Sequence, residues 1–125
     1  MPVSYNINHT TGFIETRCTG NVTFEEIMGH FRELEADPAL PKRLDVFLDL
    51  DKMTSLPESD QLQDVTRAIE RLQARVEWGS CAILASRDAL FGMSRMFEVF
   101  ADGLFSRSCV FLEREEAERW LNDTR

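Results

Sequence analysis

The stretch that decides the fold is LDVFLDL, residues 44–50. It is short and mostly apolar, and it alternates little between apolar and polar residues, which is typical of a central strand covered on both faces. Two further short apolar runs, residues 80–85 and 107–112, follow later in the chain. We expect all three to lie side by side in one sheet, because strand–helix–strand units with short connections favour parallel pairing.

Apolar side chains recur every three or four positions between and after these runs, which indicates amphipathic helices. Four helices are predicted, over residues 24–36, 55–76, 90–105 and 113–122. Thr23 and Glu26 have the spacing of a capping box, in which a hydroxyl and a carboxylate each accept a hydrogen bond from a backbone N–H.

The second and third helices also have start signals. Ser55 and Glu58 fit a second capping box, and either Ser86 or Asp88 is expected to cap the third helix. Gly79 is expected to break the chain before the strand at residues 80–85.

The beginning of the chain predicts a β-hairpin. Residues 3–7 and 13–19 alternate between apolar and polar side chains, with a short turn between them. Residues 1–125 are therefore expected to form a single α/β domain. It would contain one mixed sheet of about five strands, an N-terminal hairpin plus three largely parallel strands, with four helices in the order β-β-α-β-α-β-α-β-α. The pattern leaves the order of the strands within the sheet open.

Composition restricts the classes of partner. The net charge is −8 at pH 7, so we expect no nucleic-acid partner, because phosphate backbones favour basic proteins. No apolar run approaches about 18 residues, and the N-terminus lacks the pattern of a signal peptide. The expectation is a cytoplasmic protein without a transmembrane segment.

The residues that most often carry chemistry are sparse. Cys18, Cys81 and Cys109 are widely spaced, and each lies inside a strand-like run, so we interpret them as reduced core residues. His9 and His30 are not at metal-ligand spacing. No nucleotide-binding or nucleophile motif is present. The sequence therefore calls for no cofactor, no metal and no catalytic residue.

Polar residues follow two of the predicted parallel strands, at the edge where ligands collect in such sheets. Asp49 and Asp51 lie at the end of the strand at residues 44–50, and Ser86 and Arg87 follow the next strand. Two carboxylates two positions apart on a strand point the same way, so they could bind a divalent cation or act as acid and base. The alternative is that Asp51 is solvated and that Asp49 accepts backbone N–H groups.

The third helix carries more apolar side chains than one buried stripe needs. At about 100° per residue its core stripe is Leu90, Met93, Phe97, Phe100, Ala101 and Leu104. Phe91 and Arg95 fall on the opposite side, where Phe91 is expected to be more exposed than the stripe, and Met96 and Val99 widen one flank. Three explanations of this excess are open. The helix is wedged between the sheet and a neighbouring element, or it presents Phe91, Arg95, Met96 and Val99 to a protein partner, or it lines a cavity for an apolar ligand.

Short motifs accompany this order of elements: FLDL at residues 47–50, GMSRMF at residues 92–97, VF at 110–111, EA at 116–117 and WL at 120–121. Together they resemble the bacterial STAS-like proteins, which are related to anti-sigma-factor antagonists and whose fold is similar to that of the CRAL-TRIO lipid carriers. The resemblance covers nearly the whole chain. It implies a small cytosolic signalling or binding module rather than an enzyme.

The resemblance also implies where a phosphate would be attached. In anti-sigma-factor antagonists a serine is phosphorylated at the start of the helix after the third strand, within an Asp-Ser-Ser-Gly-like stretch. The corresponding region here is MTSLPESD, residues 53–60, which lacks that pattern. Ser55 and Ser59 are candidate phospho-acceptors by location. A phosphate there would gain from the helix N-terminus and be opposed by Glu58 and Asp60.

Three functions remain open. The first is a non-enzymatic regulatory or protein-interaction module, with a protein partner or a second copy of the chain in a homodimer. The second is a carrier or sensor that holds an apolar small molecule or lipid under the third helix. The third is a metal-dependent enzyme that uses Asp49 and Asp51.

Overall fold

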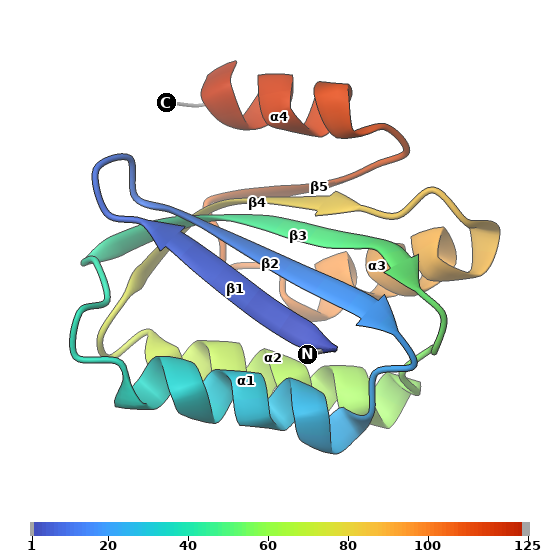
Figure 1. Ribbon diagram of the computed structural model, residues 1–125, viewed down its shortest axis with the longest axis horizontal. Helices are drawn as coiled ribbons and strands as arrows, with labels where there is room; N and C mark the ends of the chain where they lie inside the picture. The colour runs from blue at the N-terminus through green and yellow to red at the C-terminus, as the bar shows by residue number, and fades with distance from the viewer. Residues whose placement is uncertain (1, 124–125) are drawn as a thin grey trace.

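The computed structural model describes residues 2–123, which form one five-stranded sheet with helices on both faces (Figure 1). The strands are β1 (Val3–Asn8), β2 (Phe13–Gly20), β3 (Arg43–Met53), β4 (Glu77–Leu84) and β5 (Arg107–Phe111). They lie side by side in chain order, with β1 antiparallel to β2 and every later pair of neighbours parallel. The predicted mixed sheet with its N-terminal hairpin is confirmed.

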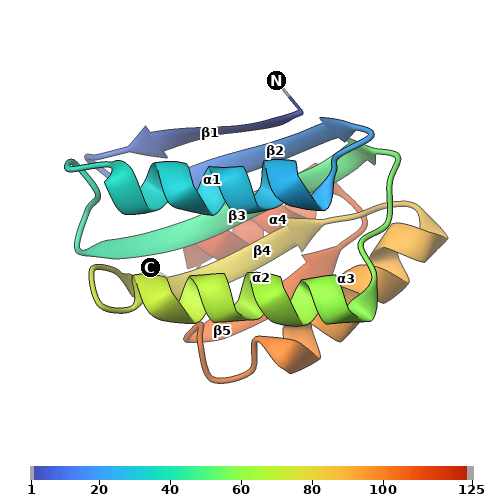
Figure 2. The ribbon, with the colours of Figure 1, turned by 90° about the horizontal axis from the view of Figure 1, so that it is seen from below.

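The helices form two unequal layers. One face of the sheet is covered by α1 (Phe24–Ala36), α2 (Ser59–Leu72) and α3 (Asp88–Phe100), and the other by α4 (Arg114–Asp123) (Figures 1 and 2). This is the predicted order of elements. Within the described part of the chain, every helix is too short or too polar to cross a lipid bilayer.

Both faces of β3 are covered, as its apolar sequence predicts. Val46 and Leu48 pack against the larger hydrophobic core, which contains residues of α1, α2 and α3. Phe47, between them, packs on the α4 side in a smaller core with Ala82, Leu84, Ala117 and Leu121. The strand is longer than predicted, because it continues through residues 51–53 beside the end of β2.

The capping box at the start of α1 is confirmed. The Thr23 hydroxyl accepts a hydrogen bond from the Glu26 N–H at 3.1 Å. The Glu26 carboxylate accepts one from the Thr23 N–H at 2.9 Å. These two bonds satisfy backbone donors that no turn of the helix can reach.

The predicted capping box of Ser55 and Glu58 is wrong. α2 begins at Ser59, and the Gln61 side chain accepts a hydrogen bond from the Glu58 N–H at 2.9 Å. The Ser55 hydroxyl is engaged elsewhere: it accepts from the Val22 N–H at 2.8 Å and donates to the Val22 carbonyl at 2.9 Å. Ser55 therefore ties the loop after β3 to the turn after β2, a long-range contact that local spacing does not reveal.

The predicted start and end of the third helix also need correction. Arg87 is the N-cap residue of α3, and neither Ser86 nor Asp88 occupies that position; the Ser86 hydroxyl donates instead to Asp51. The helix ends at Phe100, short of the predicted end at residue 105. The chain turns just beyond it, where Gly103 has a φ of +87° that other residues rarely adopt.

Gly79 lies inside β4 instead of breaking the chain before it. The register between β3 and β4 shifts near this point, and the Asp45 carboxylate accepts a hydrogen bond from the Ser80 N–H at 2.8 Å. A Cβ on Gly79 would lie 2.1 Å from the Asp45 Oδ1 atom. The glycine therefore permits a close approach within the sheet.

Phe97→Ala should destabilise the protein by about 3–5 kcal/mol, because Phe97 is a buried core phenylalanine. Phe91→Ala removes the same atoms from a half-buried position on the same helix, so its loss should be clearly smaller. Chemical denaturation of the wild type and both variants, in a monomeric preparation, measures the difference. Equal losses would show that Phe91 is as much a part of the core as Phe97.

Candidate functional site

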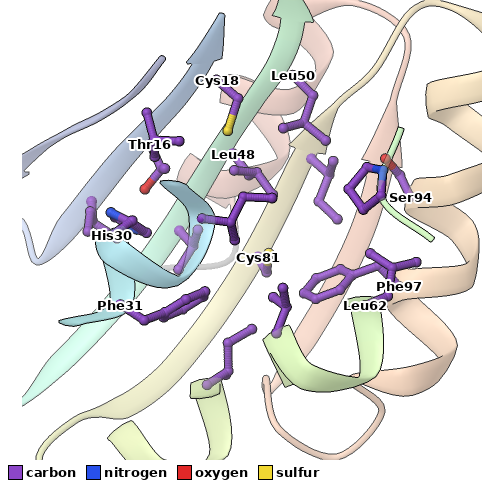
Figure 3. A pocket seen from close by; sticks show the side chains of 18 of the residues that line it. Thr16, Cys18, His30, Phe31, Leu48, Leu50, Leu62, Cys81, Ser94 and Phe97 are labelled. Atoms are coloured by element: carbon purple, nitrogen blue, oxygen red, sulfur yellow. The ribbon is translucent and has the colours of Figure 1, made fainter. Parts of the chain in front are cut away.

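An apolar cavity of about 120 Å³ lies between the sheet and the layer of α1, α2 and α3 (Figure 3). The sheet contributes side chains from β1 to β4, among them Thr16, Cys18, Val46, Leu48 and Cys81. The helices contribute His30 and Phe31 from α1, Leu62 and Val65 from α2, and Met93, Ser94 and Phe97 from α3. The cavity is thus built from seven elements that are distant in sequence.

Small side chains explain why the space is not filled. Thr16 and Cys18 stand on β2 and Cys81 on β4, on either side of the central strand β3, at positions where leucine or phenylalanine would close the gap to the helices. Val46 and Leu48 remain half-buried although they lie on the central strand, because the cavity lies beside them.

Ser94 places an unpaired hydroxyl in the wall of the cavity. The residue is 1 % exposed, and its Oγ has no hydrogen-bond partner among the described residues. The nearby Trp78 differs, because its indole N–H donates to the Ile69 carbonyl at 3.0 Å. Buried hydroxyls are nearly always paired, so Ser94 is the polar atom of this cavity that needs an explanation.

His30 is held neutral at the α1 side of the cavity. Its ring centroid lies 5.2 Å from that of Tyr5 and 5.4 Å from that of Phe31. Burial lowers the pKa of His30 from 6.5 to about 4, because the imidazolium would lose its hydration. Among the described residues that line the cavity, none is an aspartate, glutamate, lysine or arginine.

The cysteines have the chemistry of core residues. Burial is the main cause that raises the pKa of Cys18 to about 11 and that of Cys81 to about 12, so both stay protonated thiols at neutral pH. All three cysteines are free and lie in strands, as predicted. Cys109, however, is only half-buried, because it lies on the edge strand β5.

Asp49 is held by two arginines instead of facing an open site. It is 8 % exposed, and its Oδ2 accepts a hydrogen bond from Arg114 Nη2 at 2.7 Å and lies 3.5 Å from Arg17 Nε. Its Oδ1 accepts from the Asp51 N–H at 3.0 Å. The Arg114 guanidinium also lies over the Phe47 ring, 4.7 Å from its centroid. Asp49 therefore anchors the start of α4 to the sheet.

The other residues predicted at the strand ends lie near one another. The exposed Asp51 accepts a hydrogen bond from the Ser86 hydroxyl, and Arg87 follows as the N-cap of α3. Within residues 2–123, no group of three or more His, Cys, Asp or Glu side chains is arranged to hold a metal ion.

The two candidate phospho-acceptors differ in accessibility. Ser55 is half-buried, and its hydroxyl makes both hydrogen bonds to Val22. Ser59 is exposed at the first residue of α2, between Glu58 and Asp60. A phosphate on Ser55 would have to break the link to Val22, whereas Ser59 is open to solvent.

The outer side of α3 is partly apolar. Met96 is 43 % exposed and Val99 is 72 % exposed, while Arg95 pairs with Glu98 at 3.1 Å. Phe91 is half-buried. It is more exposed than the stripe residues Leu90, Phe97 and Ala101, but Met93, Phe100 and Leu104 are half-buried as well, so the predicted contrast holds for only part of the stripe.

Comparison with known proteins identifies the fold. The chain is similar to a solved structure of an uncharacterised protein of the DUF3478 family with a SpoIIAA-like fold from Shewanella loihica PV-4. The TM-score is 0.62 at 16 % identity, over 95 % of this chain and 91 % of the other. No model of a protein family matches the chain, and no curated protein matches it. The SpoIIAA-like fold is the STAS-like fold, so the resemblance noted in the sequence is confirmed for the fold.

Sequence reasoning missed Ser94 as a site residue, although a signal was present. Ser94 lies four residues after Leu90 and three before Phe97, so a helical projection puts its hydroxyl inside the apolar stripe. A polar residue within a core stripe needs a partner. None of the neighbouring residues in sequence supplies it.

Ser94→Ala should raise the free energy of unfolding by about 1 kcal/mol, because it removes a buried hydroxyl that has no hydrogen bond. Ser55→Ala is the matched control and should lower it by about 1–2 kcal/mol, because it removes two hydrogen bonds to Val22. Urea denaturation measures both changes. A Ser94→Ala variant less stable than the wild type would show that the hydroxyl has a partner within the protein.

Stability should depend on pH through His30. The unfolded chain binds the imidazole proton more tightly than the folded protein, so stability falls as the pH drops from about 6.5 toward about 4. Between pH 7 and pH 5 the loss should be about 2 kcal/mol. Urea denaturation of the wild type and of His30→Phe at both pH values isolates the contribution of His30 to the pH dependence of stability. If the variant loses as much stability as the wild type, His30 is not its source.

Proposed function

We propose that this protein is a non-enzymatic regulatory module that binds a small apolar molecule in the cavity beneath α1, α2 and α3. The observation that carries this proposal is the cavity itself: a folded domain normally fills its core, yet this one leaves about 120 Å³ unfilled beside its central strand. The side chains around an empty space lose van der Waals contacts, and a bound ligand would restore these contacts.

The chemistry of the cavity favours binding over catalysis. Catalysis needs a nucleophile, a base or an acid that can reach the substrate. The thiols of Cys18 and Cys81 are protonated, and His30 is buried among aromatic rings. Asp49 is engaged by arginines on the other face of the sheet, so the metal-dependent enzyme is the weaker hypothesis.

A regulatory role in the cytosol accords with the fold and with the cysteines. The described residues form a small domain of STAS-like fold, which is the size expected of a regulatory or binding module. The three cysteines are unpaired, as is usual in a reducing compartment. Both points support the proposal that the protein acts by binding.

A second candidate function is protein interaction through the outer side of α3. Exposed apolar side chains are common singly, but Met96 and Val99 lie one turn apart on the same helix. A protein partner or a second copy of the chain would cover them. Native mass spectrometry separates the candidates, because a partner subunit and a small molecule add very different masses.

Toluene should raise the melting temperature of the wild-type protein. At about ten times its dissociation constant, a ligand that binds only the folded state adds about 1.4 kcal/mol, or roughly 5 °C for a domain of this size. Leu48→Trp should abolish the rise, because the larger ring occupies the cavity. Leu112→Trp is the matched control, since Leu112 is 55 % exposed and lies outside the cavity. Differential scanning calorimetry measures all three proteins.

Two results would overturn the proposal. One is a wild-type melting temperature that toluene leaves unchanged. The other is a rise that persists in Leu48→Trp, which would place the binding site elsewhere. Val46→Phe fills the same space from a neighbouring position and replaces Leu48→Trp if that variant does not unfold cooperatively.

A further inference from the structure

The hydroxyl of Ser94 is the feature of the cavity that can select a ligand. Ser94 lies on α3 between Met93 and Phe97, among the side chains that line the cavity (Figure 3). It is 1 % exposed, and its Oγ has no hydrogen-bond partner in the described part of the chain. A serine within a helix commonly donates to the carbonyl four residues earlier, but Ser94 does not bond to Leu90.

An unpaired hydroxyl at this place favours a ligand with a polar atom. The group has lost its hydrogen bonds to water on folding and has gained none in return. A ligand oxygen within reach of Ser94 would restore one bond and would itself be satisfied. With a purely apolar ligand, the Ser94 hydroxyl would stay unpaired, and the energetic penalty of burying it would remain.

The surroundings of Ser94 exclude a charged ligand. No described residue that lines the cavity is an aspartate, glutamate, lysine or arginine. Burial lowers the pKa of His30, so the imidazole is neutral at physiological pH and offers no positive charge to a carboxylate. An ion transferred there would lose its hydration without a counter-charge, which is strongly unfavourable.

The size of the cavity limits the ligand further. Its volume of about 120 Å³ is similar to that of apolar protein cavities of roughly 150 Å³ that hold benzene. A volume of about 120 Å³ is too small for a long acyl chain. The occupant is therefore a compact molecule the size of a single ring.

We propose that the cavity selects a small neutral molecule the size of one ring, with one hydroxyl or carbonyl oxygen that hydrogen-bonds to Ser94 Oγ. Phenols, cyclic alcohols and cyclic ketones have this chemistry. The inference rests on the proposed function, because it names the class of ligand for the same cavity. Ser94 is the residue that determines specificity.

Phenol and toluene are suitable probes, because they have the same number of non-hydrogen atoms and differ in one hydroxyl. Isothermal titration calorimetry gives the dissociation constant of each probe for the wild type and for Ser94→Ala. Loss of one hydrogen bond should weaken phenol binding roughly 3- to 10-fold and leave toluene within about twofold. Ser4→Ala removes a hydroxyl from an exposed position outside the cavity and should change neither affinity.

The outcomes separate this inference from the proposed function. If toluene binds and Leu48→Trp blocks it, but Ser94→Ala changes phenol and toluene equally, only the role of Ser94 is wrong. Benzoate bound by the wild type as tightly as phenol would overturn the requirement for a neutral ligand. If neither phenol nor toluene binds the wild type, the proposed function fails and this inference fails with it.

Discussion

The structure depends on one constraint: the central strand β3 must bury apolar side chains on both of its faces. The two faces solve this problem differently. On one side a single helix, α4, closes over Phe47 and is fixed there by the hydrogen bond of Arg114 to Asp49. On the other side three helices are available, and their positions are set by connections to four strands. These three helices cover that side of the sheet, but the side chains between them and the strands leave the cavity unfilled.

The unequal cover places the candidate site. A sheet of hydrogen-bonded strands cannot adjust its spacing to fill a gap, so only side chains or helices can do so. Thr16, Cys18 and Cys81 are too small to reach the helices. The loops that lead into α1 and α2 are tied together by the hydrogen bonds between Val22 and Ser55, which restrict how far the starts of these helices can move. The cavity is therefore the space that the side chains leave unfilled once the strands and the helices have taken their positions.

The fold could be predicted because its signals are local. Residues 44–50 and the apolar stripes of the helices each report their own environment within a few positions. The site could not be predicted, because it depends on the summed volumes of side chains from seven elements. The same reason explains why long-range partners are missed. Ser55 looks like a helix cap until Val22, 33 residues away, takes its hydroxyl. The sequence predicts that Asp49 can accept a backbone N–H, as it does from Asp51, but it gives no local sign of the pairing with Arg114, 65 residues away.

The helix α3 connects the two candidate functions physically. Ser94 and Phe97 line the cavity on its inner side, while Met96 and Val99 are exposed on its outer side. A ligand can alter the outer surface only if it binds two positions of α3 with different affinities. Among the described elements, α3 packs mainly against α2 and the edge strand β5, and its outer side is exposed at Met96 and Val99. The two candidate functions would then be linked: a ligand in the cavity would shift α3, and with it the exposed side chains that a protein partner would contact.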